Sequence, residues 1–171
     1  MVKKPKEKKD QDIQKSAGDI RLDVLKKLRV IIRTAQQHSL WIEKQCGVNG
    51  AQLWLMQELY ESAGLRVGEL AQRLAIHQTT TSNLLDGLTK RAYVEKSRDP
   101  QDLRVVRISL TEAGTALLMR APRPARGLLP EALRQLDDDQ MQCLSTGLQS
   151  LIDGIETVDE AFEMLPLPFT M

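Results

Sequence analysis

The chain has 171 residues, of which 42% are hydrophobic and 27% are charged, and its formal net charge is +1. A chain of this length can bury one good core, or one small domain with an arm that depends on a partner. Its apolar runs are far shorter than the roughly 18 to 20 residues of a membrane-spanning helix, so we exclude a membrane protein. Its lysine-rich start lacks the apolar stretch of a signal peptide, so we expect a cytoplasmic protein.

The first predicted element is a long helix behind a polar tail. Residues 1–18 are lysine-rich and almost free of large apolar groups, so we expect them to form a disordered basic tail. From residue 19 onward, apolar and small side chains recur at alternating steps of three and four. This spacing predicts one seam of a helix that ends near Gly47, made of Leu25, Leu28, Ile32, Ala35, Ser39, Ile42 and Cys46.

Two short helices with a three-residue turn are predicted next. Val67, Leu70, Ala71 and Leu74 line one helix face, Thr81, Leu84, Leu85 and Leu88 line the other, and only residues 75–77 separate them. This order is typical of a helix-turn-helix, whose second helix enters a DNA major groove. The start of that helix carries polar side chains able to reach base edges or phosphates, namely Gln78, Thr79, Thr80, Ser82 and Asn83. In the alternative interpretation, Gln78 and the threonines only cap the helix and bond its free amides.

A charged hairpin follows the second helix. Residues 93–96 read as a strand, and Val106, Ile108 and Leu110 alternate with less apolar positions, so a hairpin closes around RDPQD. An arginine on a protruding hairpin can enter the DNA minor groove. We expect Arg104 to do so, with Asp102 orienting it from the same strand face and Arg98 as a second charge. Lys90, Arg98, Asp102 and Arg104 complete the predicted DNA-binding set.

Charge is distributed unevenly along the chain. Residues 66–107 hold eight basic and five acidic side chains, a net charge of +3, whereas residues 137–171 hold eight acids and no lysine or arginine. Such asymmetry is expected when one part of a chain faces a polyanion. Ordinary scatter of solvated charge is the alternative.

The last third of the chain predicts a broken helix and then a long one. Pro122, Pro124 and Pro130 each lack an amide donor and interrupt a helix. A second seam then runs through Met141, Leu144, Leu148, Leu151, Ile155, Val158 and Phe162, opened by three aspartates at 137–139. We expect the first and last helices to pack on each other and on a second chain through Leu25, Leu28, Ile32, Leu144, Leu148, Leu151, Ile155 and Phe162. A four-helix monomer core is the alternative.

The helix-turn-helix, the Asp102-Leu103-Arg104 motif in the hairpin and the LTEAG sequence at residues 110–114 together resemble the MarR family of winged-helix regulators, over roughly residues 19–163. The resemblance implies an obligate homodimer that binds pseudo-palindromic double-stranded DNA and usually acts as a repressor relieved by a small phenolic or other effector. Two positions depart from the pattern. Ala92 stands where the family commonly has glycine, at a cost of about 1 kcal/mol in a left-handed conformation, and Gly87 lies inside the second helix with a similar cost.

The resemblance also places an effector site between the first two helices and the winged domain. His38, Trp41, Gln52 and Trp54 could lie there and bind a small aromatic or phenolic molecule. Core packing is the alternative role for both tryptophans, and a structural hydrogen bond is the alternative for His38.

Other chemistry finds little support. The only two histidines and the two cysteines, Cys46 and Cys143, form no metal-ligand spacing, and no phosphate loop or activated nucleophile is present, so we predict no metal, no cofactor and no enzyme. Some MarR-family members sense peroxides through a cysteine nearer the start of the first helix. Cys46 therefore differs in position, although a redox-sensing regulator remains one alternative.

We therefore predict a mainly α fold with a small β wing. A winged helix-turn-helix DNA-binding region occupies residues 48–122, dimerisation helices occupy residues 19–47 and 123–165, and tails occupy residues 1–18 and 166–171. The predicted function is that of a dimeric, sequence-specific, double-stranded DNA-binding regulator, a repressor released by a small-molecule effector. The remaining alternatives are a winged-helix protein–protein interaction module and a small-molecule-binding protein whose DNA role is vestigial.

Overall fold

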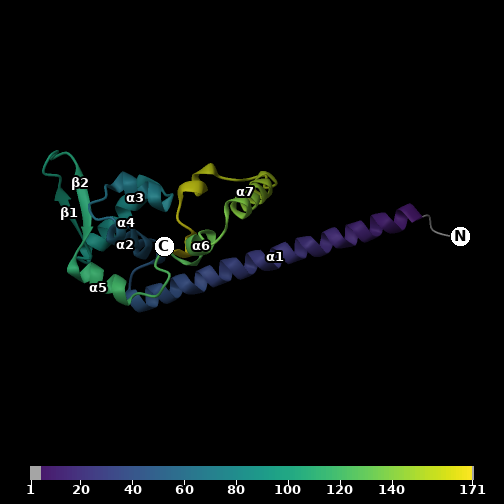
Figure 1. Ribbon diagram of the computed structural model, residues 1–171, viewed down its shortest axis with the longest axis horizontal. Helices are drawn as coiled ribbons and strands as arrows, with labels where there is room; N and C mark the ends of the chain where they lie inside the picture. Colours follow the sequence, from purple (N-terminus) through teal and green to yellow (C-terminus); the bar gives the residue numbers. More distant parts are fainter. Residues whose placement is uncertain (1–4, 171) are drawn as a thin grey trace.

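The computed structural model describes the backbone of residues 5–170 and the side chains of residues 19–159, 161–168 and 170. It is mainly helical with one two-stranded antiparallel wing, which confirms the predicted fold class (Figure 1). The elements in chain order are α1 (Pro5–Cys46), α2 (Gly50–Glu61), α3 (Val67–Leu74), α4 (Gln78–Lys90), β1 (Val94–Arg98), β2 (Val106–Leu110), α5 (Glu112–Arg120), α6 (Leu128–Leu133), α7 (Asp138–Asp153) and the 3-10 turns η1 (Glu160–Met164) and η2 (Pro168–Thr170).

Helix α2 lies at the centre of the winged-helix core. Its N-terminus is fixed by a capping box, in which the Asn49 side chain accepts from the Gln52 backbone at 2.8 Å and the Gln52 side chain accepts from the Asn49 backbone at 3.2 Å. The reciprocal bonds satisfy two amides that the helix itself cannot. One continuous cluster of buried side chains joins α2 to α3, α4, α5 and the wing, including Leu53, Leu55, Met56, Leu59, Leu70, Leu85, Leu88, Ile108, Leu117 and Leu118.

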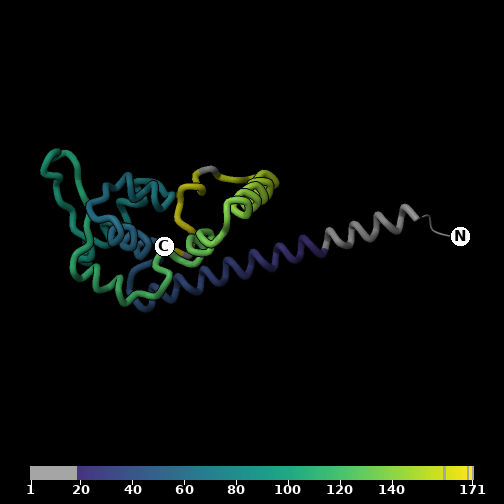
Figure 2. The backbone as a smooth tube through the Cα atoms, viewed as in Figure 1, coloured from purple at the N-terminus to yellow at the C-terminus, as the bar shows by residue number. Residues whose placement is uncertain are grey.

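The wing pairs β1 with β2 in the register Val94↔Leu110, Lys96↔Ile108 and Arg98↔Val106. Val94 and Ile108 are buried, and the remaining residues of β1 are exposed. The hairpin therefore rests on the core at its base and protrudes at its tip, as the tube in Figure 2 shows at the far left.

Helix α1 has two differing halves. Ala35, Ser39, Ile42 and Cys46 of the predicted seam are buried within this chain, whereas Leu25 and Ile32 are 46% and 48% exposed. The sequence predicts a tail over residues 1–18, but α1 begins at Pro5; residues 1–4, and the side chains of residues 5–18, lie outside the described part of the chain. The seam thus serves the chain's own core only in its C-terminal half.

Helix α7 is shorter than the sequence predicts. The predicted seam runs to Phe162, but α7 ends at Asp153 with Gly154 as its C-cap, so Ile155 and Val158 lie beyond it and Phe162 lies in η1. Glycine disfavours a helix interior, and the β-branched residues that follow add to the cost. The predicted dimer set therefore does not lie on two continuous helices.

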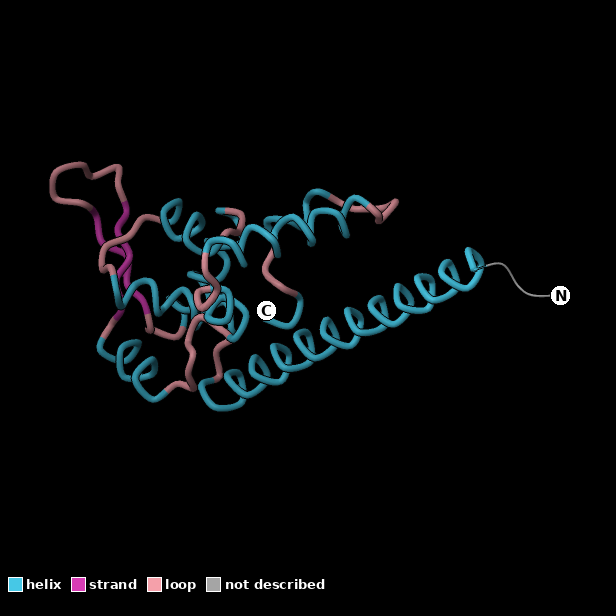
Figure 3. The backbone as a smooth tube through the Cα atoms, turned by 45° about the vertical axis from the view of Figure 1, so that its right-hand side comes forward, coloured by secondary structure: helices cyan, strands magenta, loops and turns pink. Residues whose placement is uncertain are grey.

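The described parts of α1 and α7 project away from the winged-helix body, in the direction opposite to the wing (Figures 1 and 3). No residue of α7 is buried, and its apolar residues Leu144, Leu148, Leu151 and Ile152 are 38–49% exposed. Among the described residues, no helix combines the length and apolar character that crossing a membrane requires.

Candidate nucleic-acid interface

The turn between α3 and α4 has the geometry of a helix-turn-helix. Ala75 ends α3 in the left-handed conformation at φ 53°, and His77 is the extended N-cap residue of α4. Thr81 is fully buried, and its hydroxyl donates to the His77 carbonyl at 3.1 Å. The predicted separation of the two helices by residues 75–77 is therefore correct, and Thr81 with the leucines anchors α4 to the core.

The start of α4 leaves its polar side chains free of the core. Gln78, Thr79 and Asn83 are exposed, while Thr80 and Ser82 are half-buried. The Ser82 hydroxyl donates to the Gln78 carbonyl at 3.0 Å, and the side chain of the N-cap residue His77 makes no cap hydrogen bond. The alternative interpretation requires these side chains to accept from the free backbone amides at the start of α4, and no such hydrogen bond is present among the described residues.

The wing tip differs from the predicted arrangement. Asp102 and Arg104 lie in the turn before β2, not on a strand, so they do not share a strand face. The Asp102 carboxylate instead accepts from the backbone N–H of Arg104 at 3.0 Å. Asp102 consequently fixes the backbone that carries Arg104, whose guanidinium is exposed. The physical reason is that a short aspartate side chain readily bonds a backbone amide two residues ahead.

The buried carboxylate of the wing belongs to Asp99 and not to Asp102. Asp99 was not predicted as a functional residue from the sequence. Asp99 is 7% exposed, and its carboxylate accepts from the Arg107 Nε at 2.5 Å and from the Gln101 backbone at 2.8 Å. The Gln101 N–H first, and the Arg107 guanidinium second, lower the pKa of Asp99 below its ordinary value. Arg107 also donates to the Gly64 carbonyl at 3.0 Å, so this pair ties the wing to the body. In the sequence RDPQDLRVVR, both Asp99 and Asp102 are followed by nearby arginines. The sequence therefore does not show that Asp99 pairs with the Arg107 side chain while Asp102 bonds the Arg104 backbone.

The helix start and the wing meet at one surface. A shallow hollow is lined by Gln78 of α4, Arg104 of the wing turn, and Arg66, Gly68 and Gln72 at α3. Arg66 and Gln72 are not among the residues predicted from the sequence, because nothing in their local pattern indicates that α3 borders the wing. The hollow brings together one amide and one guanidinium from the predicted DNA-binding set.

The other predicted DNA-binding residues lie further out. Lys90 is exposed as the last residue of α4, and the Arg98 Nη1 donates to the Leu103 carbonyl at 2.5 Å across the hairpin. Lys96 of β1 forms an ion pair with Asp86 of α4 at 2.8 Å, which links the wing to the outer face of that helix. Arg98 thus stiffens the tip that carries Arg104.

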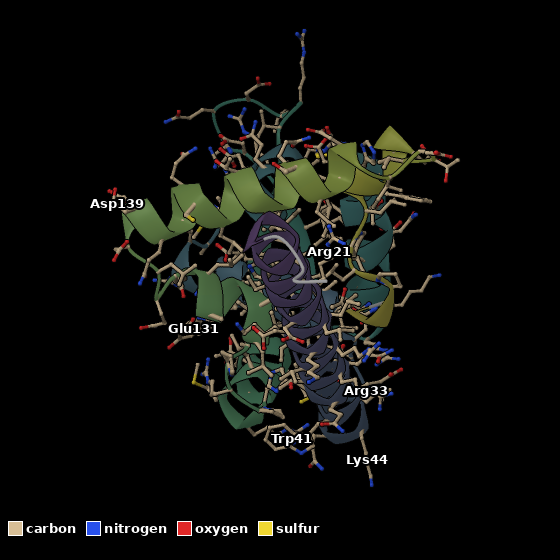
Figure 4. The ribbon with its side chains drawn as sticks, turned by 90° about the vertical axis from the view of Figure 1, so that its right-hand side faces the viewer. Arg21, Arg33, Trp41, Lys44, Glu131 and Asp139 are labelled. Atoms are coloured by element: carbon tan, nitrogen blue, oxygen red, sulfur yellow. The ribbon has the colours of Figure 1, made fainter. Side chains whose placement is uncertain are left out.

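A separate apolar pocket of about 140 Å³ lies between α1, α2, the end of α3 and α6. His38 and Trp54, two of the four predicted effector residues, line it. Trp41 and Gln52 do not: Trp41 is half exposed near the C-terminal end of α1 (Figure 4), and the Gln52 side chain is used in the capping box and donates to the Leu84 carbonyl at 3.4 Å. The sequence predicts that His38, Trp41, Gln52 and Trp54 lie near the junction of the first two helices. It does not predict which of these side chains face the pocket.

Trp54 connects the pocket to a buried acid. Its indole N–H donates to Glu58 at 3.0 Å, and Glu58 is 6% exposed. The same carboxylate accepts from Arg126 at 2.8 Å and from Arg73 of α3 at 3.3 Å. A buried carboxylate must be compensated in this way, because an unpaired charge would be costly. The pocket wall is therefore bonded to the first helix of the helix-turn-helix.

Cys46 lies in the opposite environment to that of a reactive thiol. Its side chain is buried, and burial raises the pKa of the Cys46 thiol, with partial opposition from the nearby charge of Arg120. A raised pKa leaves less thiolate at neutral pH, and the thiolate is the reactive form. This environment disfavours the redox alternative.

Comparisons with known proteins agree with this geometry. A sequence model of the MarR family matches residues 47–104. The uncharacterized HTH-type transcriptional regulator YsmB of Bacillus subtilis is 29% identical over 129 residues, which cover 75% of this chain and 88% of that protein. The HTH-type transcriptional repressor MdtR of the same organism is 24% identical, with 74% and 82% covered. A mutant of Escherichia coli MarR in complex with operator DNA shares the fold with a TM-score of 0.51 at 20% identity, covering 76% of this chain and 96% of that one.

Proposed function

This chain belongs to the MarR family of helix-turn-helix transcriptional regulators, and on that premise we propose that it represses transcription as a homodimer bound to pseudo-palindromic double-stranded DNA. The family comprises regulators rather than enzymes. MdtR carries the name of a repressor, which supports repression as the proposed action of this chain.

The observation that carries the proposal is the shared surface of α4 and the wing. Gln78 and Arg104 line one hollow, although they come from different elements, and the leucines of α4 face the core. Amide and hydroxyl groups at a helix start suit base edges in a major groove, and an arginine on a wing suits the narrow negative minor groove. One docked duplex would therefore be contacted at both points.

We assign base contacts to the polar start of α4 and backbone contacts to its end and the wing. Gln78, Thr79 and Asn83 would read bases, with Thr80 and Ser82 at the edge of that surface. Lys90, Arg98 and Arg104 would contact phosphate or the minor groove, with Asp102 as a positioning residue for Arg104. The winged-helix region would comprise residues 48–122.

A homodimer would cover the apolar surface that this chain leaves exposed. Leu25 and Ile32 on α1, and Leu144, Leu148 and Leu151 on α7, are each 38–49% exposed although they follow helical spacing. Contiguous apolar surface of this kind marks an interface in a soluble protein. Leu28, Ile155 and Phe162 would join the interface from the flanks, with residues 19–47 and 123–165 supplying the dimerisation segments.

We further propose that a small aromatic or phenolic effector occupies the pocket beside His38 and Trp54 and releases the DNA. A pocket of about 140 Å³ is close to the size of engineered apolar cavities of about 150 Å³ that bind benzene. The lining is mostly apolar, and the Ser39 hydroxyl is its polar group open to a ligand hydroxyl. The His38 Nε2 lies 3.1 Å from the Pro124 carbonyl, so this ring nitrogen already has the structural partner that was the alternative role of His38. The bond from Trp54 to Glu58, and from Glu58 to Arg73, offers a physical route to the helix-turn-helix.

The test is selection of bound fragments from genomic DNA of the source organism, followed by a salt titration of the selected site. We expect an enriched inverted repeat and a strong salt dependence, because the logarithm of affinity falls by roughly 0.9 per phosphate contact for each decade of salt. Absence of any enriched DNA, together with stable binding of a protein partner that is insensitive to salt, would instead favour the interaction module.

A further inference from the structure

The C-terminal segment forms one wall of the apolar pocket. Leu165, Pro166, Leu167 and Thr170 line it, facing residues of α1, α2, α3 and α6 that are far away in sequence. We call residues 165–170 the strap. Its path from α7 back to the pocket is drawn in yellow in Figure 1, where it descends towards the C-terminus beside α6.

The strap is held close but lightly. Leu165 and Leu167 are 46% and 45% exposed, although both line the pocket, so they bury only part of their apolar surface. Two prolines, Pro166 and Pro168, remove backbone donors, and the regular structure of the strap is the short 3-10 turn η2. The segment that leads to the strap, residues 154–159, is exposed throughout. The leucines would uncover only part of their surface if the strap left its position, whereas η2 at its end packs on α1 and α2.

Gly50 at the start of α2 lies against Ser39 and the end of the strap. A Cβ built on Gly50 would lie 3.0 Å from the Ser39 Oγ and 3.5 Å from the Thr170 Cβ. A side chain at this position would displace the Ser39 Oγ, because 3.0 Å is tighter than ordinary van der Waals contact, whereas Thr170 would be in ordinary contact with it. The end of the strap thus sits against the junction of α1 and α2, which is the floor of the pocket.

One hydrogen bond joins the strap's base to the helix-turn-helix. The backbone N–H of His77 donates to the Met164 carbonyl at 2.9 Å. His77 is the N-cap residue of α4, and α4 is the helix that would read DNA. Met164 immediately precedes the strap, so a strap that swings outward draws the Met164 carbonyl away from this turn.

We propose that the strap is a built-in lid whose position couples occupancy of the pocket to the α3–α4 turn. With the strap in place the pocket holds about 140 Å³, slightly less than the cavities of about 150 Å³ that bind benzene. A one-ring aromatic molecule that enters the pocket therefore pushes the leucines of the strap outward and releases the bond between Met164 and His77. The regulatory meaning of this release rests on the DNA-binding function proposed above, whereas the lid and its coupling do not.

The first experiment measures access to the pocket in the full chain and in a chain truncated after Glu163, which lacks both the strap and the Met164 carbonyl. Fluorobenzene is the probe and fluorine NMR is the readout. If the strap covers the mouth in about 90% of molecules, truncation tightens fluorobenzene binding roughly tenfold, because only the open fraction binds. Equal affinity in the two chains, or no binding to either, would overturn the lid.

Two point variants protect this test against a folding defect. The double variant Leu165→Ser and Leu167→Ser keeps the full chain and should tighten fluorobenzene binding in the same direction. Val158→Ser is the matched control, because Val158 is 46% exposed on the same segment but does not line the pocket. Tighter binding in the control as well as in the double variant would count against the strap.

The second experiment measures coupling by amide hydrogen exchange. We expect saturating fluorobenzene, and separately the truncation, to lower protection of the His77 amide several-fold. The Thr81 amide is the internal control, since it donates to the His77 carbonyl within α4 at 3.0 Å and does not contact the strap. Unchanged His77 protection in the fluorobenzene complex would overturn the coupling. Neither experiment contains DNA, so failure of operator binding would refute the proposed function while leaving these results standing.

Discussion

Two glycines in the winged helix meet different steric demands. A Cβ at Gly114 in α5 would overlap the Tyr93 carbonyl oxygen, which is backbone and cannot turn aside. A Cβ at Gly87 in α4 would lie 2.7 Å from the Gln52 Nε2, the far end of a flexible side chain. Gly114 is therefore required by the contact between α5 and the start of the wing, whereas Gly87 is required only by a contact that can adjust.

The same substitution at these two sites should separate them. We expect Gly114→Ala to lower the free energy of unfolding by about 1–3 kcal/mol, the usual range for overpacking. Gly87→Ala should be nearly neutral, since a helix-propensity gain of about 1 kcal/mol offsets the displacement of Gln52. Urea denaturation followed by circular dichroism measures both, and equal losses in the two variants would contradict this account.

The two cysteines should differ in reactivity at the level of single side chains. Burial raises the pKa of Cys46, so its thiolate becomes abundant only at a pH above the ordinary thiol range, whereas Cys143 is exposed on α7. Iodoacetamide at neutral pH should modify Cys143 first and leave Cys46 largely intact, as read by mass spectrometry of peptides. Unfolding in urea should abolish the difference. Rapid modification of folded Cys46 would reopen the redox alternative.

At the scale of an element, Arg104 and Arg107 of the wing have separate tasks. Arg107 is bonded to Asp99 and to the Gly64 carbonyl and so holds the hairpin against the body, whereas Arg104 has only its backbone fixed, by Asp102. The sequence alone presents both as arginines that follow an acid in one charged stretch. Only the fold shows which pair is structural.

Arg104→Ala should therefore weaken DNA binding without lowering the stability of the folded chain. We expect weaker binding across all sequences and a salt slope smaller by roughly one contact, with an almost unchanged melting temperature. Arg107→Ala is the matched comparison, because it removes the same charge but should also lower the melting temperature by loosening the wing. If Arg104→Ala binds the operator normally, or loses binding only by unfolding, the wing tip has no part in recognition.

Local signals account for the elements that the sequence predicted correctly. The bounds of α3 and α4 follow from helical spacing and a short turn, and the wing follows from alternation around RDPQD. The left-handed geometry expected at Ala92 is also present, at φ 57°, and Ala75 repeats it at φ 53°. Each of these features depends on residues that are close in sequence. Hydrophobic periodicity and turn-forming residues can therefore predict it.

The features that sequence reasoning missed depend on contacts between distant segments. The pocket joins α1 to residues 165–170, and the buried Glu58 joins Trp54 to Arg73 and Arg126. No local sequence pattern predicts these long-range contacts. The end of α7 was missed for a different reason: apolar residues continue at helical spacing past Gly154, so the spacing predicts a helix that the glycine ends.

At the scale of the whole molecule, the exposed apolar rows on α1 and α7 predict self-association. Ile32→Asp or Leu151→Asp should convert the dimer into a monomer in sedimentation equilibrium, because burying an unpaired carboxylate costs several kcal/mol. Val30→Asp is the control, since Val30 is 64% exposed on the opposite face of α1. A wild-type chain that is monomeric and stably folded at micromolar concentration would refute the dimer.

The symmetry of such a dimer predicts the form of its DNA site. A two-fold axis presents two copies of α4 to one face of the duplex, so the half-sites should be inverted and their centres about 10 to 10.5 base pairs apart. Gln78 and Asn83 are both exposed on α4, and each would relax base preference when replaced by alanine, at two positions related by the two-fold axis. Thr89, which is exposed near the other end of α4 and bonded to the Leu85 carbonyl at 2.8 Å, provides the control substitution, because its loss should leave base preference intact. Selection of binding sites from a random pool measures all three variants, and a change of preference at one half-site only, or none for Gln78→Ala and Asn83→Ala, would show that these side chains do not read the bases.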